Sequence, residues 1–264
     1  FGTGEIMGVI IATLRRIPET KLLAEKIQEA IEALSAGIQE GEAGYSFESL
    51  ILNVNSGKGP VMMGRENITL AGNPTIMDRL MGLDLEISPN SFYQINPAQT
   101  EKLYRKVIEY AELTGSETIL DLYCGVGAIG LLLAEKAGRV IGIESVKAAV
   151  INANRNAVMN GIVNAEFICG KAEEKLPELI SQGLRADLVI LDPPRAGCDS
   201  ALLEAVAEAG PQRIVYVSCD PATLARDIKI LLQKGYNLVE AQPVDMFPHT
   251  MHIECVIGMQ RKDT

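Results

Sequence analysis

The chain has 264 residues, and because 47% of them are hydrophobic it can bury a sizeable core and does not have the composition of a disordered segment. No stretch approaches the roughly 18 uninterrupted apolar residues that a membrane-spanning helix needs, which excludes a bilayer span. The formal net charge of −10 argues against a surface that binds bulk polyanions.

The first 86 residues predict part of a small α+β domain. Pro18–Leu34 carries apolar residues at helical spacing with charged residues between them, which predicts a helix. Aliphatic runs predict strands at Gly4–Leu14, Ser49–Val54 and Asn67–Leu70, with turns at Asn55–Pro60 and Gly72–Pro74. These elements are too few for a large sheet, so we interpret residues 1–86 as the remainder of a scaffold or docking domain.

From residue 87 to the end, predicted strands and helices alternate. Strands are expected at Thr118–Tyr123, Arg139–Ile143, Ala165–Cys169, Asp187–Leu191, Arg213–Ser218 and Leu238–Val244. Helices are expected at Pro97–Leu113, Gly125–Ala137, Ala148–Asn160, Ser200–Glu208 and Pro221–Gln233. This alternation predicts a parallel sheet with helices on both faces. We therefore expect a doubly wound, Rossmann-like α/β domain over residues 87–264.

A glycine-rich loop follows the first strand of this domain. Gly125, Gly127 and Gly130 have the G-x-G-x-x-G spacing, which lets the backbone turn tightly and approach a ligand at a helix N-terminus. Glu144 ends the next strand, where a carboxylate can bind ribose hydroxyls. The pattern fits a nicotinamide dinucleotide (NAD) and S-adenosylmethionine equally well. Tight strand–helix packing is the simpler alternative, and Asp121 beneath the loop could tie it down.

Three further segments follow predicted strands: Asp192-Pro-Pro-Arg195, Ser218-Cys-Asp-Pro221 and the run from Asp245 to Glu254. Because the carboxyl ends of parallel strands share one edge of a sheet, these groups should converge there. Cys219 comes just before a helix N-terminus, where the partial positive charge favours the thiolate, although the neighbouring Asp220 charge opposes this effect. Both a structural cysteine and a nucleophile fit these local features.

Five segments carry a resemblance to a known family. They are Ser88-Pro-Asn-Ser-Phe-Tyr-Gln-Ile-Asn96, Leu120-Asp-Leu-Tyr-Cys-Gly-Val-Gly127, Asp192-Pro-Pro-Arg-Ala-Gly197, Ile214-Val-Tyr-Val-Ser-Cys219 with Pro221-Ala-Thr-Leu-Ala-Arg226, and Asp245-Met-Phe-Pro-His-Thr-Met-His-Ile-Glu254. In this order they resemble the RNA (uracil-5-)-methyltransferases, which make 5-methyluridine in tRNA and 23S ribosomal RNA. The resemblance covers Glu86 to Met259, and residues 1–86 resemble the tail of that family's central domain.

The resemblance implies an S-adenosylmethionine-dependent methyltransferase and a role for particular residues. Cys219 matches the nucleophile that attacks C6 of uracil, and Glu254 matches the base that removes the C5 proton. The positions that match the family's cofactor-binding residues are Gln94, Tyr123, Glu144 and Asp192, beside Gly125 and Gly127 of the loop. Asp220 stands where the family usually has asparagine, and because aspartate caps a helix equally well we expect activity to survive.

The resemblance also implies an RNA substrate. The Ser-Phe-Tyr-Gln and Leu-Tyr-Cys-Gly segments look closer to bacterial members that act on 23S ribosomal RNA than to those that act on tRNA. The five cysteines lack framework spacing, so we expect a reducing cytoplasm and no metal or iron–sulfur ligands. The chain starts at Phe1 without the family's oligonucleotide-binding barrel, so we interpret it as a fragment. No membrane association and no obligate protein partner are expected.

Other functions fit parts of the sequence. The Asp192-Pro-Pro-Arg195 turn resembles that of N-methyltransferases acting on exocyclic amines, which need no cysteine nucleophile. The glycine spacing alone also fits an NAD-dependent oxidoreductase. A non-enzymatic RNA-binding module would leave Gln94, Glu144 and Glu254 without roles. Uracil-5 methylation accounts for all of these residues and is the interpretation that we favour.

Overall fold

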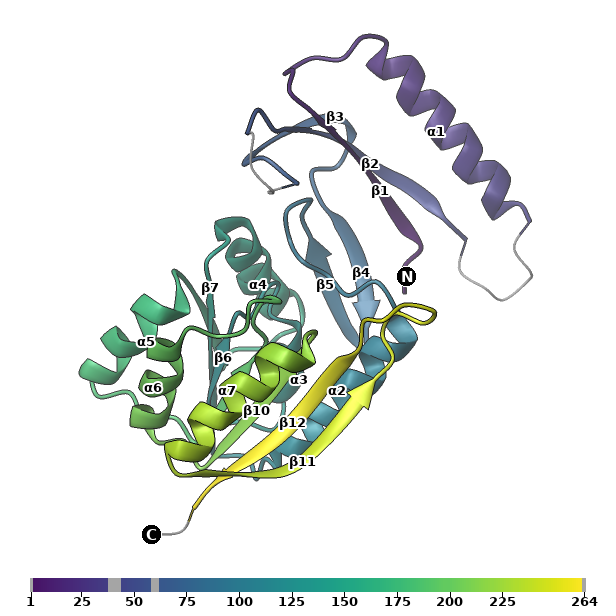
Figure 1. Ribbon diagram of the computed structural model, residues 1–264. Coiled ribbons are helices and arrows are strands. Elements are labelled where there is room, and N and C mark those ends of the chain that lie inside the picture. The colour runs from purple at the N-terminus through teal and green to yellow at the C-terminus, as the bar shows by residue number, and fades with distance from the viewer. Residues whose placement is uncertain (1, 38–43, 58–61, 263–264) are drawn as a thin grey trace. The chain divides into compact units, whose positions relative to one another are not determined.

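The computed structural model describes residues 2–37, 44–57 and 62–262 (Figure 1). The chain divides into two compact units, Phe1–Phe92 and Tyr93–Thr264. The boundary expected between residues 86 and 87 lies within β5 (Leu83–Ile87), the second strand of a hairpin. Among the helices of the described residues, none is both long enough and apolar enough to cross a bilayer.

The N-terminal unit contains a three-stranded sheet with a helix packed on it. The strand order is β1 (Glu5–Ala12), β2 (Ser46–Val54) and β3 (Glu66–Gly72), with β1 parallel and β3 antiparallel to β2. α1 (Thr20–Ser35) packs against β2 and β3. The three predicted strands and the predicted helix are therefore confirmed, while part of the turn expected at Asn55–Pro60 lies outside the described residues.

A hairpin formed by β4 (Ile76–Leu80) and β5 was not predicted. Its two-residue turn, Met81–Gly82, has φ angles of 51° and 90°. Such left-handed angles at both positions are typical of a type I′ turn, which Asn-Gly or Asp-Gly usually signals. Methionine at the first turn position removes that signal, so the hairpin was missed.

The C-terminal unit is built on a seven-stranded sheet of order β11-β12-β10-β9-β6-β7-β8. Its strands are β6 (Thr118–Leu122), β7 (Arg139–Glu144), β8 (Ala165–Cys169), β9 (Leu188–Leu191), β10 (Arg213–Ser218), β11 (Tyr236–Val244) and β12 (Glu254–Arg261). The predicted parallel sheet needs one correction, because β12 runs antiparallel to both β10 and β11. Glu254 was expected at the end of a loop, whereas it is the first residue of this inserted strand.

Helices cover both faces of this sheet, which confirms the doubly wound α/β fold (Figure 1). One face carries α2 (Pro97–Ala111), α3 (Ala128–Ala134) and α4 (Lys147–Met159), and the other carries α5 (Ala172–Ser181), α6 (Ser200–Ala209) and α7 (Pro221–Gln233). All of them except α5 were predicted. The interior Pro177 weakened the helical signal of α5.

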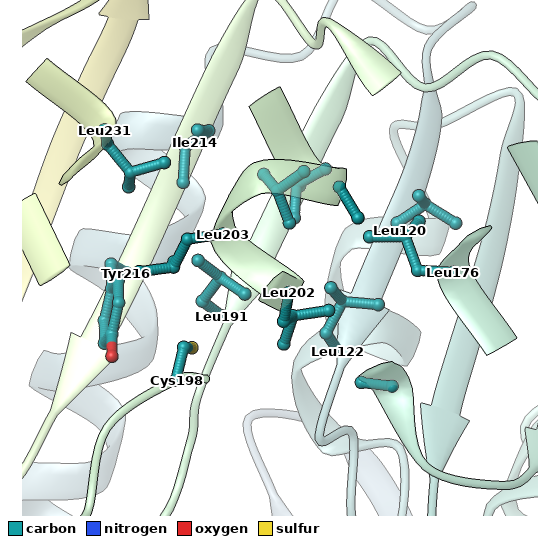
Figure 2. Packing of buried hydrophobic residues seen from close by; sticks show 14 of the residues in the cluster. Leu120, Leu122, Leu176, Leu191, Cys198, Leu202, Leu203, Ile214, Tyr216 and Leu231 are labelled. Carbon is teal, nitrogen blue, oxygen red and sulfur yellow. The ribbon is translucent and has the colours of Figure 1, made fainter. Parts of the chain in front are cut away.

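The α5–α7 face encloses the main hydrophobic cluster. Leu120 and Leu122 of β6 point into it, together with Leu202 and Leu203 of α6, and these four side chains are fully buried (Figure 2). Because side chains alternate along a strand, Asp121 between the two leucines faces the opposite side of the sheet, toward α3. The core packing thereby fixes the direction in which this buried carboxylate points.

Two loop glycines allow α3 to pack closely on the sheet. Gly127 has a φ of 84°, and a Cβ there would lie 2.8 Å from Cζ of Phe167 and 3.1 Å from Cβ of Ala153. A Cβ at Gly130 would lie 2.9 Å from Oδ2 of Asp121. Gly125 has a φ of 56°, but a Cβ there would meet no atom within 4 Å. Close packing therefore explains why positions 127 and 130 need glycine. It does not explain why glycine stands at position 125, where a side chain would have room.

Gly127→Ala should lower the free energy of unfolding by about 2–4 kcal/mol, because the left-handed φ costs about 1 kcal/mol and the overlap with Phe167 adds about 1–3 kcal/mol. Gly125→Ala is the matched control in the same loop and should cost only about 1 kcal/mol, from the backbone alone. Urea unfolding followed by circular dichroism measures both values. If both variants lost the same free energy of unfolding, the overlap with Phe167 would not contribute to the effect of Gly127→Ala.

Candidate active site

The predicted site residues gather at one edge of the seven-stranded sheet. Glu144 ends β7, Asp192 directly follows β9, and Cys219 directly follows β10. Glu254 reaches the same edge from the opposite direction, because it begins the antiparallel β12. The glycine loop leaves β6 at this edge as well. The topology thus brings together residues as far apart in the sequence as Gly125 and Glu254, which are 129 positions apart.

The ladder between β10 and β12 sets the positions of Cys219 and Glu254. Ser218 pairs with Cys255, so the next residues outward along the antiparallel register, Cys219 and Glu254, lie opposite each other. Glu254 also pairs with Val244 of β11 and is only 4% exposed. Cys219 is half-buried. The structure therefore places the predicted thiol beside the predicted base.

The electrostatic surroundings of this thiol differ from the expectation at a helix N-terminus. Burial raises the pKa of Cys219, Glu254 and Asp192 raise it further, and Arg195 lowers it. Burial also raises the pKa of Glu254, while Arg195 opposes that change. The net direction for the pKa of Cys219 is upward, and this answers a question that the sequence left open, because the favourable helix end and the opposing Asp220 charge could not be weighed there. The neighbouring carboxylates and the burial outweigh the helix.

The residue after the cysteine caps α7 as predicted. The Asp220 carboxylate accepts hydrogen bonds from the backbone N–H groups of Ala222 and Thr223, both at 2.9 Å. These bonds lower the pKa of Asp220 and keep it ionised. Aspartate thus serves here as the helix cap.

Two carboxylates hold the glycine loop. Oδ2 of Asp121 accepts a 3.0 Å hydrogen bond from the N–H of Gly130, which confirms the expectation that Asp121 ties the loop down. Oε2 of Glu144 accepts from the N–H of Gly125 at 3.2 Å, and Oε1 accepts from the N–H of Val146 at 2.7 Å. Glu144 therefore supports the loop in addition to any contact with a ligand.

Tyr123 lies at the start of the loop in a strained conformation. Its φ is 65°, and its hydroxyl donates a 2.6 Å hydrogen bond to Oε1 of Glu173. Glu173 lies in the first turn of α5, and neither the residue nor the helix was predicted. The adjacent acidic residues Glu173 and Glu174 are a helix-start signal that could have located them.

Gln94 precedes α2 and is also nearly inaccessible to solvent, with 5% of its surface exposed. Asn96 caps this helix, accepting from the N–H of Gln99, and its Nδ2 donates to the carbonyl oxygen of Met246 at 3.2 Å. This bond ties the Gln94 segment to the connection that leads into Glu254. Oε1 of Gln94 is buried without a hydrogen-bond partner, as is Oδ1 of Asp121.

The acids gathered at this edge have raised pKa values. Burial raises the pKa of Asp192 to about 8, with further effects from Glu254 and Asp121. Burial likewise raises the pKa of Asp121 to about 7, although the N–H of Gly130 opposes the change and Glu144 adds to it. A bound cation would favour the charged carboxylates. The acids, the two unpartnered oxygens and the open space at Gly125 fit a cationic ligand with hydrogen-bond donors, such as S-adenosylmethionine.

Within the described residues, no three His, Cys, Asp or Glu side chains form a group suited to a metal ion.

Comparisons with known proteins agree with this geometry. Residues 20–262 match the family model described as tRNA (Uracil-5-)-methyltransferase. An uncharacterized RNA methyltransferase of Caldanaerobacter subterraneus subsp. tengcongensis is 47% identical over 261 residues, covering 99% of this chain and 55% of the relative. An uncharacterized RNA methyltransferase of Enterococcus faecalis is 47% identical over 256 residues, covering 97% of this chain and 53% of the relative. The chain thus spans about half the length of the curated relatives that it matches.

Among solved structures, this chain is also similar to a methyltransferase that acts on uracil in RNA. The Pyrococcus abyssi tRNA (uracil-54, C5)-methyltransferase, in complex with S-adenosyl-L-homocysteine, is 33% identical with a TM-score of 0.70, and the match covers 95% of this chain and 55% of that one. Trm5b from the same organism has a TM-score of 0.63 at 18% identity and shares the fold alone. The extent of the family match and the identity to these relatives show that the chain belongs to the tRNA (uracil-5-)-methyltransferase family.

Proposed function

We propose that this chain carries the catalytic site of an S-adenosylmethionine-dependent methyltransferase that methylates C5 of a uridine in 23S ribosomal RNA. The observation that carries the proposal is the pairing of Ser218 with Cys255 across β10 and β12, because the same register continued by one residue brings Cys219 opposite Glu254, at the edge of the sheet where the glycine loop begins. Neither an N-methyltransferase nor an oxidoreductase needs a thiol and a buried acid at these two positions.

The cofactor would be held by residues from three strand ends, those of β6, β7 and β9, and from the segment before α2. The backbone of Gly125 and Gly127 lets it approach the N-terminus of α3, and Glu144 is placed to bind its ribose. Gln94, Tyr123 and Asp192 complete the set, and a bound sulfonium would favour ionisation of the Asp192 carboxyl, whose pKa is raised in the free protein. When bound, S-adenosylmethionine supplies an electrophilic methyl group.

Cys219 and Glu254 would act at different steps, because C5 of uracil is a poor nucleophile by itself. Addition of the Cys219 thiolate to C6 forms a carbon–sulfur bond and moves the C5–C6 π electrons into an enolate. C5 then accepts the methyl group with that electron pair. The Glu254 carboxylate removes the C5 proton, and the electrons of the broken C–H bond re-form the C5–C6 double bond and expel the thiolate.

The burial of Glu254 suits this role as a base. Its raised pKa makes the carboxylate a stronger proton acceptor at neutral pH. Arg195 lowers the pKa values of both Cys219 and Glu254, so it favours the two ionised forms that the first and last steps need. A target base stacked in RNA cannot reach the thiol, so the uridine must be unstacked or flipped out.

Two RNA classes are candidate substrates. The similarity of the Ser-Phe-Tyr-Gln and Leu-Tyr-Cys-Gly segments to ribosomal members favours 23S ribosomal RNA. The Pyrococcus abyssi relative is named for uracil 54 of tRNA, which makes tRNA the second candidate. Mapping 5-methyluridine in both RNAs from cells lacking the gene would decide between them.

Glu144→Ala should weaken S-adenosylmethionine binding by about 1.5–3 kcal/mol, the contribution of hydrogen bonds to a charged group. Calorimetry on this chain without RNA measures the change, and Glu135→Ala, exposed at the end of α3, should bind like the wild type. Unfolding curves show whether the lost bond to Gly125 also loosens the loop. An unchanged affinity would contradict the assignment, and tight binding of NAD would indicate an oxidoreductase.

Cys219→Ala should form no covalent RNA species and no 5-methyluridine, because the enolate cannot form. Glu254→Gln should permit attack and methylation and then stall with the C5 proton in place, so that protein stays attached to RNA. A denaturing gel with labelled RNA, run for enzyme containing this chain, detects the adduct. Normal turnover by Glu254→Gln, or 5-methyluridine made by Cys219→Ala, would overturn the covalent mechanism. Methylation of an exocyclic amine by Cys219→Ala would favour the N-methyltransferase alternative.

Asp192→Asn should become more stable than the wild type as pH rises from 4 to 9. The folded-state pKa of about 8 lies above the ordinary value of 3.8, so the wild type loses stability as pH rises through this window. Asparagine cannot ionise, and the gain should approach about 5–6 kcal/mol by pH 9, because each pH unit between the two pKa values contributes about 1.4 kcal/mol. Glu117→Gln should show the opposite difference in stability and be less stable than the wild type. The reason is that hydrogen bonds led by the Thr114 hydroxyl lower the pKa of Glu117 to about 2 in the folded protein. Denaturant unfolding at each pH measures both differences, and a gain for Asp192→Asn that stays constant with pH would contradict the raised pKa of this carboxyl.

A further inference from the structure

One face of α7 is fastened to the turn that carries Arg195. Thr223, Arg226 and Asp227 have i, i+3 and i+4 spacing, so they lie on the same side of the helix. The Thr223 hydroxyl donates to the carbonyl oxygen of Arg195 at 3.1 Å. Nη2 of Arg226 donates to the carbonyl oxygens of Ala196 at 2.9 Å and of Cys198 at 3.2 Å. Three backbone carbonyls of one turn are thus bound by one helix.

Asp227 is the buried centre of these contacts. Its side chain is completely inaccessible to solvent. Oδ2 accepts from the N–H of Cys198 at 2.8 Å and from the hydroxyl of Tyr216 at 2.7 Å, and Oδ1 is paired with Arg226 at 2.7 Å. Figure 2 shows Tyr216 of β10 next to Cys198. Asp227 therefore joins the turn, the helix and the strand that precedes Cys219.

The turn packs against α7 too closely for any side chain between them. Gly197 has a φ of 72°, and a Cβ there would lie 2.6 Å from Oδ2 of Asp227 and 2.5 Å from Nη2 of Arg226. The N–H of Gly197 closes the turn on the carbonyl oxygen of Pro194 at 2.8 Å. Because packed interiors transmit small displacements, a shift of Asp227 would move this backbone.

The two bodies that Asp227 joins carry the reactive groups. The turn from Arg195 to Cys198 carries Arg195, while Asp192 lies before this turn, directly after β9, and α7 begins at Pro221, two residues after Cys219. We propose that Asp227 is a positioning residue, which holds Arg195 at a fixed place beside Cys219 through the turn from Arg195 to Cys198. This inference rests on the proposed function, since it deepens the account of how that same thiol is prepared.

The charges around Cys219 predict what happens when the turn is released. Glu254 on β12 and Asp192 after β9 oppose the thiolate, Asp220 on the same helix is ionised, and Arg195 favours the thiolate. If Arg195 moves away, the opposing carboxylates stay in place. Asp227→Asn keeps an acceptor for Tyr216 and Cys198 but loses the ion pair with Arg226, so it should loosen the turn with little change in volume.

The first test is the pH dependence of Cys219 alkylation by iodoacetamide, resolved by peptide mass spectrometry. In Asp227→Asn the midpoint should rise by about one pH unit, so that Cys219 reacts about tenfold more slowly below it. The exposed Cys169 is an internal control and should react at an unchanged rate. Asp199→Asn, the same substitution at the exposed cap of α6, should leave the Cys219 profile unchanged. A wild-type Cys219 profile in Asp227→Asn would overturn the proposal.

The second test uses enzyme containing this chain and the RNA that it methylates. Asp227→Asn should lower kcat by about tenfold or more while KM for S-adenosylmethionine changes by less than about threefold, because the thiol step is affected and cofactor binding is not. A drop in activity that is entirely in KM would overturn the positioning role. If the wild type makes no 5-methyluridine, the proposed function fails, while the alkylation comparison still decides the role of Asp227.

Thr223→Val provides a variant with an intact core. It removes the hydroxyl that binds the Arg195 carbonyl and leaves Asp227 and its partners in place. If circular dichroism shows that Asp227→Asn does not fold, Thr223→Val alone carries the test. It should slow Cys219 alkylation in the same direction by about threefold, a smaller effect because only the neutral hydroxyl is lost, which the carbonyl oxygens of Arg195 and Asp220 share at 3.1 and 3.2 Å. An unchanged rate would overturn the proposal.

Discussion

The register between β10 and β12 is the constraint on which the candidate site depends. Ser218 and Cys255 are paired, and this pairing puts Cys219 opposite Glu254 at the end of the ladder. A slip of one residue would turn every β12 side chain to the other face of the sheet. Buried Val256 and Ile257 oppose such a slip, because they would exchange places in the core. Hydrophobic packing of the last strand therefore sets the relation between nucleophile and base.

The gathering of acidic side chains at this edge of the sheet makes their ionisation unfavourable, and a bound cation would offset this effect. Asp121, Asp192 and Glu254 are drawn into one partly desolvated edge, where burial raises the pKa values of all three and repulsion adds to the effect at Asp121 and Asp192. Arg195 opposes the rise in pKa at Glu254 and at Cys219. A ligand that binds only the folded state stabilises it, and a sulfonium in this field gains most from ionised carboxylates. The overall acidity of the chain is thus compatible with a cationic cofactor.

The sequence predicted the local features of this site, and tertiary pairing supplied the rest. Helical spacing and the N-cap at Asp220 located α7, and the run of apolar residues before Asp192 located β9. The place of β12 between β10 and β11 depends on pairing across about 40 residues, which no local pattern encodes. The burial that raises the pKa of Cys219 likewise comes from tertiary packing, and the residues around the cysteine carry no signal of it. The partners of Asp227 come from three separate segments and leave no signal in the spacing of a single one.

The residues that hold the backbone at this edge are the ones expected to touch the cofactor. An ionised carboxylate has about four lone-pair sites, and Glu144 uses three of them for Gly125, Ser145 and Val146. Asp121 holds Gly130 with one oxygen and keeps the other unpartnered. Folding of the loop therefore orients these carboxylates before any ligand arrives, which lowers the ordering cost of binding. The stability of the glycine loop and the affinity for the cofactor therefore depend on the same side chains. A substitution such as Glu144→Ala, which probes cofactor binding, also removes hydrogen bonds that hold the loop.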